Sequence, residues 1–120
     1  MNNKYFVLAC AVAFVGVTFY FGSGTTGREA IEDLLPFAQC LAEKEVTMYG
    51  AAWCAHCQNE KKRFGDSFDA VPYVECPDNP QVCLDKEIEG YPTWILPDGR
   101  KLLGEQGLEK LAKESGCPLP

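Results

Sequence analysis

The sequence predicts an α/β domain behind a single N-terminal transmembrane helix. Short runs of β-branched and aromatic residues alternate with helix-forming segments after residue 35. Residues 97–99, Pro-Asp-Gly, separate the last two of these runs as a hairpin turn would. The transmembrane helix is predicted by residues 5–21, which contain no charge. With 120 residues, 47% of them hydrophobic, the chain can form one domain of ordinary size.

The apolar run of residues 5–21 is interpreted as an uncleaved signal-anchor. Its 17 residues lie at the lower limit of about 17–25 for a spanning helix, and residues 22–24 match a signal-peptidase site only weakly. Lys4 keeps the short N-terminal side in the cytoplasm, so the rest of the chain is expected on the periplasmic side of the cell inner membrane, held by this single pass. A cleaved signal peptide is the alternative, and it leads to the same compartment. Residues 22–34 form a tether or connector that begins with small, flexible residues.

Charge and cysteine content narrow the function classes. The net charge is −6 and the isoelectric point is about 4.7, so the chain lacks the basic surface that nucleic acid requires. Seven cysteines in 120 residues are many. In an oxidising compartment such a count indicates a disulfide framework, whereas in the cytosol it would suggest metal sites.

The first half of the domain is expected to contain a helix, a strand and a second helix. Apolar residues recur at helical spacing over residues 28–44, but Pro36 interrupts them, so either a helix kinks there or the domain begins there with Pro36 in its first turn. Residues 46–49 read as a buried strand. The second helix runs through residues 58–64 and ends at Gly65.

The second half is expected to contain three more strands and two more helices. The predicted strands are residues 72–75, 93–96 and 100–103, of which the last two form the hairpin. Residues 76–80 form a turn-rich loop, and residues 81–88 a short helix. The last helix has an apolar face at Leu108, Leu111 and Ala112 and ends at Gly116.

The strongest chemical signal is Trp-Cys-Ala-His-Cys at residues 53–57, directly after the first strand. Cys54 falls in the exposed first turn of the second helix, where unpaired amides and the positive helix end stabilise a thiolate. His56 would add to this effect when it is protonated, although it could also be a mere exposed polar residue. Cys57 lies one turn further on and should remain a thiol. Cys54, Cys57 and His56 are therefore the candidate catalytic residues.

The pairing and role of the other cysteines have several interpretations, because spacing alone does not determine disulfide connectivity. Cys76 and Cys83 are expected to form a structural disulfide, and a second redox pair is the alternative. Cys40 and Cys117 are a less certain further pair. A zinc site is a further alternative, with Cys54, Cys57, Cys76 and Cys83 as its ligands. No metal or other cofactor is predicted.

The ordered motifs resemble a thioredoxin-like domain over residues 35–117, which implies a thioredoxin-like α/β fold with a central mixed sheet flanked by helices. They are a strand, W-C-x-x-C at a helix start, an aromatic-Pro-Thr, a hairpin and a terminal helix. The segments M-Y-G-A-A-W-C-A-H-C-Q, P-Y-V-E-C and G-Y-P-T-W are most similar to the thioredoxin-like domain fused to bacterial vitamin K epoxide reductase homologues. The resemblance implies that Pro92 follows a cis peptide bond and that Trp53, Tyr91 and Pro92 contact substrate. Tyr91 could equally be a core aromatic residue, and Trp94 is expected to be one. Met48 departs from thioredoxin, which has a buried acid at that strand position.

These features predict a membrane-anchored, extracytoplasmic thiol–disulfide oxidoreductase that uses the Cys54–Cys57 dithiol. Its expected partners are cysteine-containing protein substrates and a membrane disulfide oxidase or reductant, of the vitamin K epoxide reductase type or similar. Oxidation of protein thiols is the favoured direction, since a stabilised Cys54 thiolate stabilises the reduced enzyme. A reductase or isomerase of the same fold, or a non-enzymatic metal-handling or binding module, is the alternative.

Overall fold

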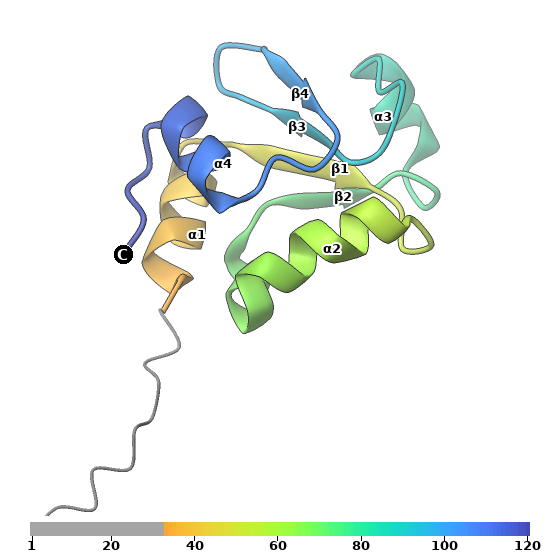
Figure 1. Ribbon diagram of the computed structural model, residues 1–120. Helices are drawn as coiled ribbons and strands as arrows, with labels where there is room; N and C mark the ends of the chain where they lie inside the picture. The colour runs from red at the N-terminus through yellow and green to blue at the C-terminus, as the bar shows by residue number, and fades with distance from the viewer. Residues whose placement is uncertain (1–32) are drawn as a thin grey trace, which may run out of the picture.

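The computed structural model describes residues 33–120, which form a four-stranded mixed sheet with helices packed against it (Figure 1). The predicted anchor at residues 5–21, and all but the last two residues of the 22–34 connector, lie outside the described residues. None of the helices within residues 33–120 has both the length and the hydrophobicity needed to cross a bilayer.

The sheet has the strand order β2-β1-β3-β4. β1 is parallel to β2, whereas β1–β3 and β3–β4 are antiparallel pairs. The elements in chain order are α1 (Leu35–Glu43), β1 (Thr47–Gly50), α2 (Ala55–Phe64), the 3₁₀ helix η1 (Gly65–Ala70), β2 (Tyr73–Glu75), α3 (Pro80–Asp85), β3 (Thr93–Ile95), β4 (Lys101–Leu103) and α4 (Leu108–Ser115). This mixed sheet with flanking helices fits the thioredoxin-like α/β fold that the sequence predicted.

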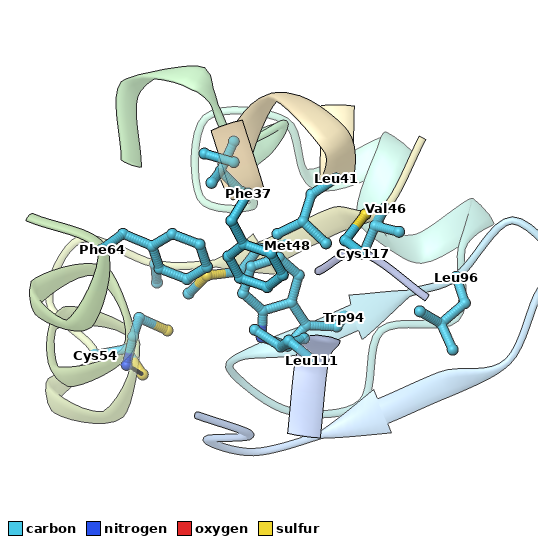
Figure 2. Packing of buried hydrophobic residues seen from close by; sticks show 14 residues of the cluster. Phe37, Leu41, Val46, Met48, Cys54, Phe64, Trp94, Leu96, Leu111 and Cys117 are labelled. Carbon is cyan, nitrogen blue, oxygen red and sulfur yellow. Dashed lines mark hydrogen bonds between the residues drawn. The ribbon is translucent and has the colours of Figure 1, made fainter. Parts of the chain in front are cut away.

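Alternate residues of the central strands build two separate cores, because successive side chains of a strand face opposite sides of the sheet. Met48 and Trp94 pack on one side with apolar residues of α1, α2 and α4. Tyr49 packs on the other side with Cys76 and Cys83, next to α3. Figure 2 shows Trp94 in the middle of the larger core and Cys54 at its edge. Trp94 has no exposed surface, so its prediction as a core residue is confirmed.

The observed start of α1 shows whether the first helix kinks at Pro36, and the observed end of α3 corrects a predicted boundary. Asp33 and Leu34 are not helical, and α1 begins at Leu35 with Pro36 in its first turn, where the missing proline N–H costs no intrahelical bond. The helix therefore starts here rather than kinking. α3 ends at Asp85, three residues before the predicted end, because the chain turns back so that the Ile88 amide bonds to the Cys83 carbonyl at 2.9 Å.

The 3₁₀ helix η1 was not predicted. Gly65 ends α2 with φ 56°, as its predicted capping role requires, but the chain then continues in tighter turns to Ala70. The Phe68 ring packs at 5.8 Å from both Phe64 and Tyr73. These aromatic contacts hold η1 between α2 and β2.

Glu60 on α2 is a buried carboxylate that the sequence analysis did not single out. Its side chain has no exposed surface. Its Oε1 accepts hydrogen bonds from Trp94 Nε1 at 3.2 Å and from the amides of Gln106 and Gly107 at 3.0 and 3.1 Å. Arg63 Nε lies 3.5 Å from Oε2. Glu60 therefore joins α2 to the core tryptophan and to the segment that precedes α4.

We expect Glu60→Ala to lower the free energy of unfolding by about 2–3 kcal/mol, since the buried Trp94 Nε1 and the half-buried amides of Gln106 and Gly107 lose their acceptor. Urea denaturation would measure this loss. Glu60→Gln keeps an acceptor oxygen and should lose less, and the exposed Glu43→Ala should change stability little. A Glu60→Ala protein as stable as wild type would show that these hydrogen bonds contribute nothing net.

Candidate active site

The two unpaired cysteines of the described chain, Cys54 and Cys57, lie at the start of α2. Cys54 is the N-cap residue, and its sulfur accepts a hydrogen bond from the Cys57 amide at 3.2 Å. Cys54 was predicted to lie in an exposed first turn, but only 7% of it is accessible, because its side chain turns back over the first turn of α2. Cys57 is completely buried. The arrangement leaves Cys54 as the one sulfur of the pair with any access to a reactant.

Cys57 is held as a neutral thiol. Burial is the main reason that its pKa rises to about 12, and the hydrogen bond with Cys54 raises it further. The Ala51 amide and the charge of Lys61 oppose this effect but are weaker. At neutral pH the protonated form of Cys57 is therefore strongly favoured, as predicted from its place one turn behind Cys54.

Gly50, the last residue of β1, leaves room for the Cys57 sulfur. A Cβ at this position would lie 2.9 Å from Cys57 Sγ and 3.3 Å from both Cε2 and the hydroxyl of Tyr73. Any other residue would have to push one of these groups aside. Cys57 and Tyr73 thus meet at the carboxyl end of β1, although 16 residues separate them in the chain.

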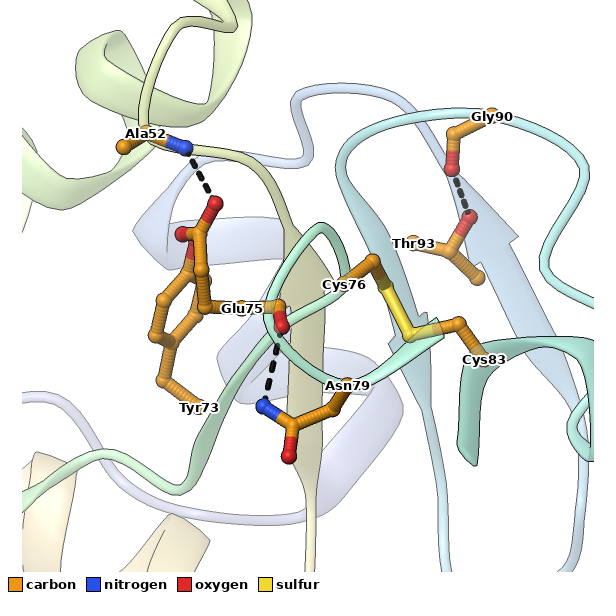
Figure 3. The surroundings of a disulfide bond; sticks show 8 residues. All are labelled: Ala52, Tyr73, Glu75, Cys76, Asn79, Cys83, Gly90 and Thr93. Carbon is orange, nitrogen blue, oxygen red and sulfur yellow. Dashed lines mark hydrogen bonds between the residues drawn. A yellow bond between two sulfur atoms is a disulfide. The ribbon is translucent and has the colours of Figure 1, made fainter. Parts of the chain in front are cut away.

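Tyr73 and Glu75 on β2 support the loop that carries the dithiol (Figure 3). The Tyr73 hydroxyl donates to Glu75 Oε2 at 2.5 Å, and Glu75 Oε1 accepts from the Ala52 amide at 2.8 Å. Burial raises the pKa of Tyr73, and the bond to Glu75 adds to it, so the phenol stays neutral and donates. Lys61 Nζ lies 3.6 Å from the centre of the Tyr73 ring.

Tyr73 and Glu75 were predicted to lie on a strand, but no role in the site was predicted for them. A signal was available, because residues two apart in a strand share a face and the ends of parallel strands lie at the same edge of a sheet. Lys61 of α2 is half buried against the Tyr73 ring, whereas Lys62 and Arg63 are exposed.

His56 is 72% exposed and is bonded through Nδ1 to Glu105 Oε1 at 2.7 Å. Glu105 belongs to the segment between β4 and α4 and also accepts from Asn59 at 3.1 Å and from Arg63 at 2.9 Å. These three bonds lower the pKa of Glu105 to about 2, and the bond to His56 has the largest effect. Glu105 was not predicted as a site residue, because no motif around it indicates the contact.

The predicted substrate-contact residues occupy different environments. The rings of Trp53 and Tyr91 meet edge to face with centroids 5.9 Å apart, and Trp53 is 72% exposed. The Tyr91–Pro92 peptide bond is cis, as the resemblance implied. Pro92 is fully buried, and its carbonyl accepts from the Gly104 amide at 2.7 Å. Trp53 and Tyr91 therefore offer an aromatic surface, while the Pro92 ring offers none.

The remaining described cysteines form two disulfides. Cys76–Cys83 links residues seven apart around the start of α3, and Cys40–Cys117 links α1 to the segment after α4 across 77 residues. The first bond removes two sulfurs from the four-cysteine zinc alternative. Within residues 33–120 no three histidine, cysteine or carboxylate side chains are grouped so that they could hold a metal ion.

The chain is similar in sequence to proteins whose names indicate thiol–disulfide chemistry. No protein-family model matches it. It is 40% identical over 97 residues to the thiol-disulfide oxidoreductase LTO1 of Arabidopsis thaliana, a match that covers 70% of this chain and 26% of that protein. It is 35% identical over 72 residues to a thioredoxin domain-containing protein 5 homolog of Drosophila melanogaster, covering 50% and 17%. It is 29% identical over 127 residues to protein disulfide isomerase-like 2-2 of Oryza sativa subsp. japonica, covering 88% and 32%.

The matched stretch thus spans about a third or less of each of these relatives. Their names and the mixed sheet together support a thioredoxin-like domain with a redox-active dithiol.

Proposed function

We propose that this thioredoxin-like domain is a thiol–disulfide oxidoreductase in which Cys54 exchanges with substrate and Cys57 resolves. The observation that carries the proposal is the asymmetry of the pair: Cys54 accepts the Cys57 amide at the start of α2, while Cys57 is fully buried and its pKa is raised to about 12. One sulfur is thereby suited to leave and attack as a thiolate, and the other to stay protonated.

In the oxidising direction the enzyme begins with a Cys54–Cys57 disulfide. A substrate thiolate attacks Cys54 Sγ, the S–S bond breaks, and Cys57 leaves and takes up a proton. The second substrate thiol loses its proton and attacks the substrate sulfur of the mixed disulfide, which releases Cys54 as a thiolate. Two electrons pass from the substrate dithiol to the enzyme. The reducing direction runs through the same mixed disulfide in reverse.

Oxidation of cysteine-containing proteins is the direction that we favour. The amide bond to the Cys54 sulfur and the positive end of α2 both stabilise a thiolate, and a stabilised thiolate stabilises the reduced enzyme. The second candidate is an isomerase or reductase, because one of the relatives is named protein disulfide isomerase-like 2-2.

We further propose that residues 5–21 anchor the domain on the periplasmic side of the inner membrane. The uncharged run after Lys4 supports this location, and two structural disulfides are typical of proteins in an oxidising compartment. The proposed electron acceptor is a membrane disulfide oxidase, of the vitamin K epoxide reductase type or similar.

Oxidation of a two-cysteine peptide by the purified protein tests the proposed activity. The oxidised protein should convert one equivalent of dithiol to disulfide, with Cys54 and Cys57 appearing as new free thiols on mass mapping. The Cys54→Ala/Cys57→Ala protein should oxidise none. Thiols that react only after a chelator removes zinc would instead identify a metal-handling module.

A further inference from the structure

Cys57 and Lys61 lie one helical turn apart on the same face of α2. Residues four apart in a helix are neighbours on its surface, with about 5–6 Å between their Cβ atoms. Cys57 is completely buried and Lys61 is half buried, whereas the next residue, Lys62, is exposed. Of the two lysines, Lys61 is therefore the one on the side of the helix that carries the resolving thiol.

The Tyr73 ring holds the ammonium group of Lys61 on this side. Lys61 Nζ lies 3.6 Å from the centre of the ring, a distance at which a cation is attracted to the face of an aromatic ring. The same ring lies beside the resolving thiol, because the Cβ position of Gly50 is 2.9 Å from Cys57 Sγ and 3.3 Å from the Tyr73 hydroxyl. One side chain of β2 thus contacts the cation and adjoins the sulfur.

The other ionisable side chains on this part of α2 and β2 are occupied by bonds of their own. The Tyr73 hydroxyl donates to Glu75, so the phenol stays neutral and the carboxylate is engaged. Glu60, three residues after Cys57, accepts from Trp94 and from the segment before α4. These groups leave the ammonium of Lys61 as the charge available to a thiolate at Cys57.

The charge of Lys61 acts on Cys57 against the rest of its surroundings. Burial has the largest effect and raises the pKa of Cys57 to about 12, and the hydrogen bond with Cys54 raises it further. The positive charge of Lys61 lowers it. Lys61 therefore favours a thiolate at the sulfur that its other neighbours keep protonated.

We propose that Lys61 accelerates the resolving step by stabilising the negative charge that develops on Cys57 Sγ. The inference rests on the proposed function of Cys54 and Cys57. When Cys57 resolves a mixed disulfide, it loses its proton to water and attacks Cys54 Sγ, and the substrate sulfur leaves Cys54 as a thiolate. In the opposite direction Cys57 is the leaving group, so the same charge develops on it. A fixed cation lowers the barrier in both directions.

Reaction of the reduced protein with one equivalent of dipyridyl disulfide separates the two steps. Attack by Cys54 releases the first pyridinethione and leaves Cys54 bonded to a pyridyl sulfur. Attack by Cys57 on Cys54 then releases the second pyridinethione and forms the Cys54–Cys57 disulfide, so two electrons pass from the dithiol to the reagent. Stopped-flow absorbance follows both releases, and the reagent carries no charge that a lysine could attract.

Lys61→Met removes the charge and keeps an unbranched apolar side chain against the Tyr73 ring. Near neutral pH the second release should slow about threefold, because the Cys57 thiolate becomes rarer, while its nucleophilicity rises with a Brønsted coefficient of about 0.4–0.5 and offsets part of the loss. A rise of about half a pH unit should restore the wild-type rate, since the thiolate fraction increases with pH below the pKa of Cys57. The first release should be unchanged.

Two further variants make the result specific to the charge at this position. Lys61→Arg retains a cation over the Tyr73 ring and should release the second pyridinethione about as fast as wild type. Lys62→Met removes an equal charge from the exposed neighbour and should leave both rates unchanged.

A Lys61→Met protein that resolves as fast as wild type overturns the inference. A Lys61→Arg protein as slow as Lys61→Met also overturns it, since packing would then be responsible, and so does equal slowing in Lys62→Met, which would assign the effect to net charge. A wild-type protein that releases only one pyridinethione overturns the proposed function of the Cys54–Cys57 pair, and this inference with it.

Discussion

Replacing Cys57 by alanine stops turnover and leaves the protein covalently joined to its substrates through Cys54. The resolving thiol is fully buried behind Cys54, and without it a mixed disulfide formed at Cys54 has no neighbouring sulfur to break it. Adducts that disappear on reduction should therefore accumulate with dithiol substrates. They should also form with the proposed membrane disulfide oxidase when the two proteins are expressed together.

Replacing Cys54 by alanine should also stop turnover but give few adducts or none. Cys57 has no exposed surface, and its pKa of about 12 keeps it protonated at neutral pH, so it is a poor nucleophile. Non-reducing gels and mass spectrometry of the trapped species would identify the linked sulfur. Adducts joined through Cys57 would reverse the assigned roles of the two cysteines while leaving the fold intact.

Loss of the Cys40–Cys117 disulfide should lower the free energy of unfolding by about 4.5 kcal/mol in the chain-entropy model, because the bond closes a loop across 77 residues. The Cys76–Cys83 bond closes a loop across only seven and should contribute about 2.5 kcal/mol in the same model. The bond between α1 and the C-terminal segment is therefore expected to be the larger contributor to stability.

Urea denaturation of the two double-alanine variants tests this order. Both should carry alanine at Cys54 and Cys57 as well, so that thiol exchange cannot shuffle the remaining disulfide. The parent for comparison is the Cys54→Ala/Cys57→Ala protein. A larger loss on removing Cys76–Cys83 than on removing Cys40–Cys117 would show that local strain or packing, rather than loop length, determines the contribution of these bonds.

The strands, the hairpin and the dithiol turn could be predicted from the sequence because their signals are local. The consecutive apolar residues Met48 and Tyr49 indicate a strand that is buried on both faces, and the structure places the two residues in separate cores. W-C-x-x-C directly after this strand predicts the helix start at which Cys54 is found. Gly116 ends the last helix in a left-handed conformation, with φ 72°, where glycine is the usual residue.

The support around the dithiol could not be predicted, because it depends on contacts between distant segments. Glu105 lies 49 residues from His56, and Glu60 lies 46 from Gln106. Each is an ordinary acidic residue in an ordinary helical or loop context. Only the packing of α2 against the segment before α4 buries Glu60, and only that packing brings Glu105 to His56. The hydrogen bond from the Ala52 amide to Glu75 depends in the same way on the parallel pairing of β1 and β2.

The reduction potential of the Cys54–Cys57 couple tests the central claim most directly. A domain that stabilises the Cys54 thiolate to oxidise protein thiols should have a potential above about −200 mV, in the range of disulfide isomerases and stronger oxidants. The measurement requires only equilibration with glutathione buffers and quantification of the two forms after acid trapping. A potential at or below about −270 mV, the value of thioredoxin, would contradict the oxidising role and assign the protein to the reductases.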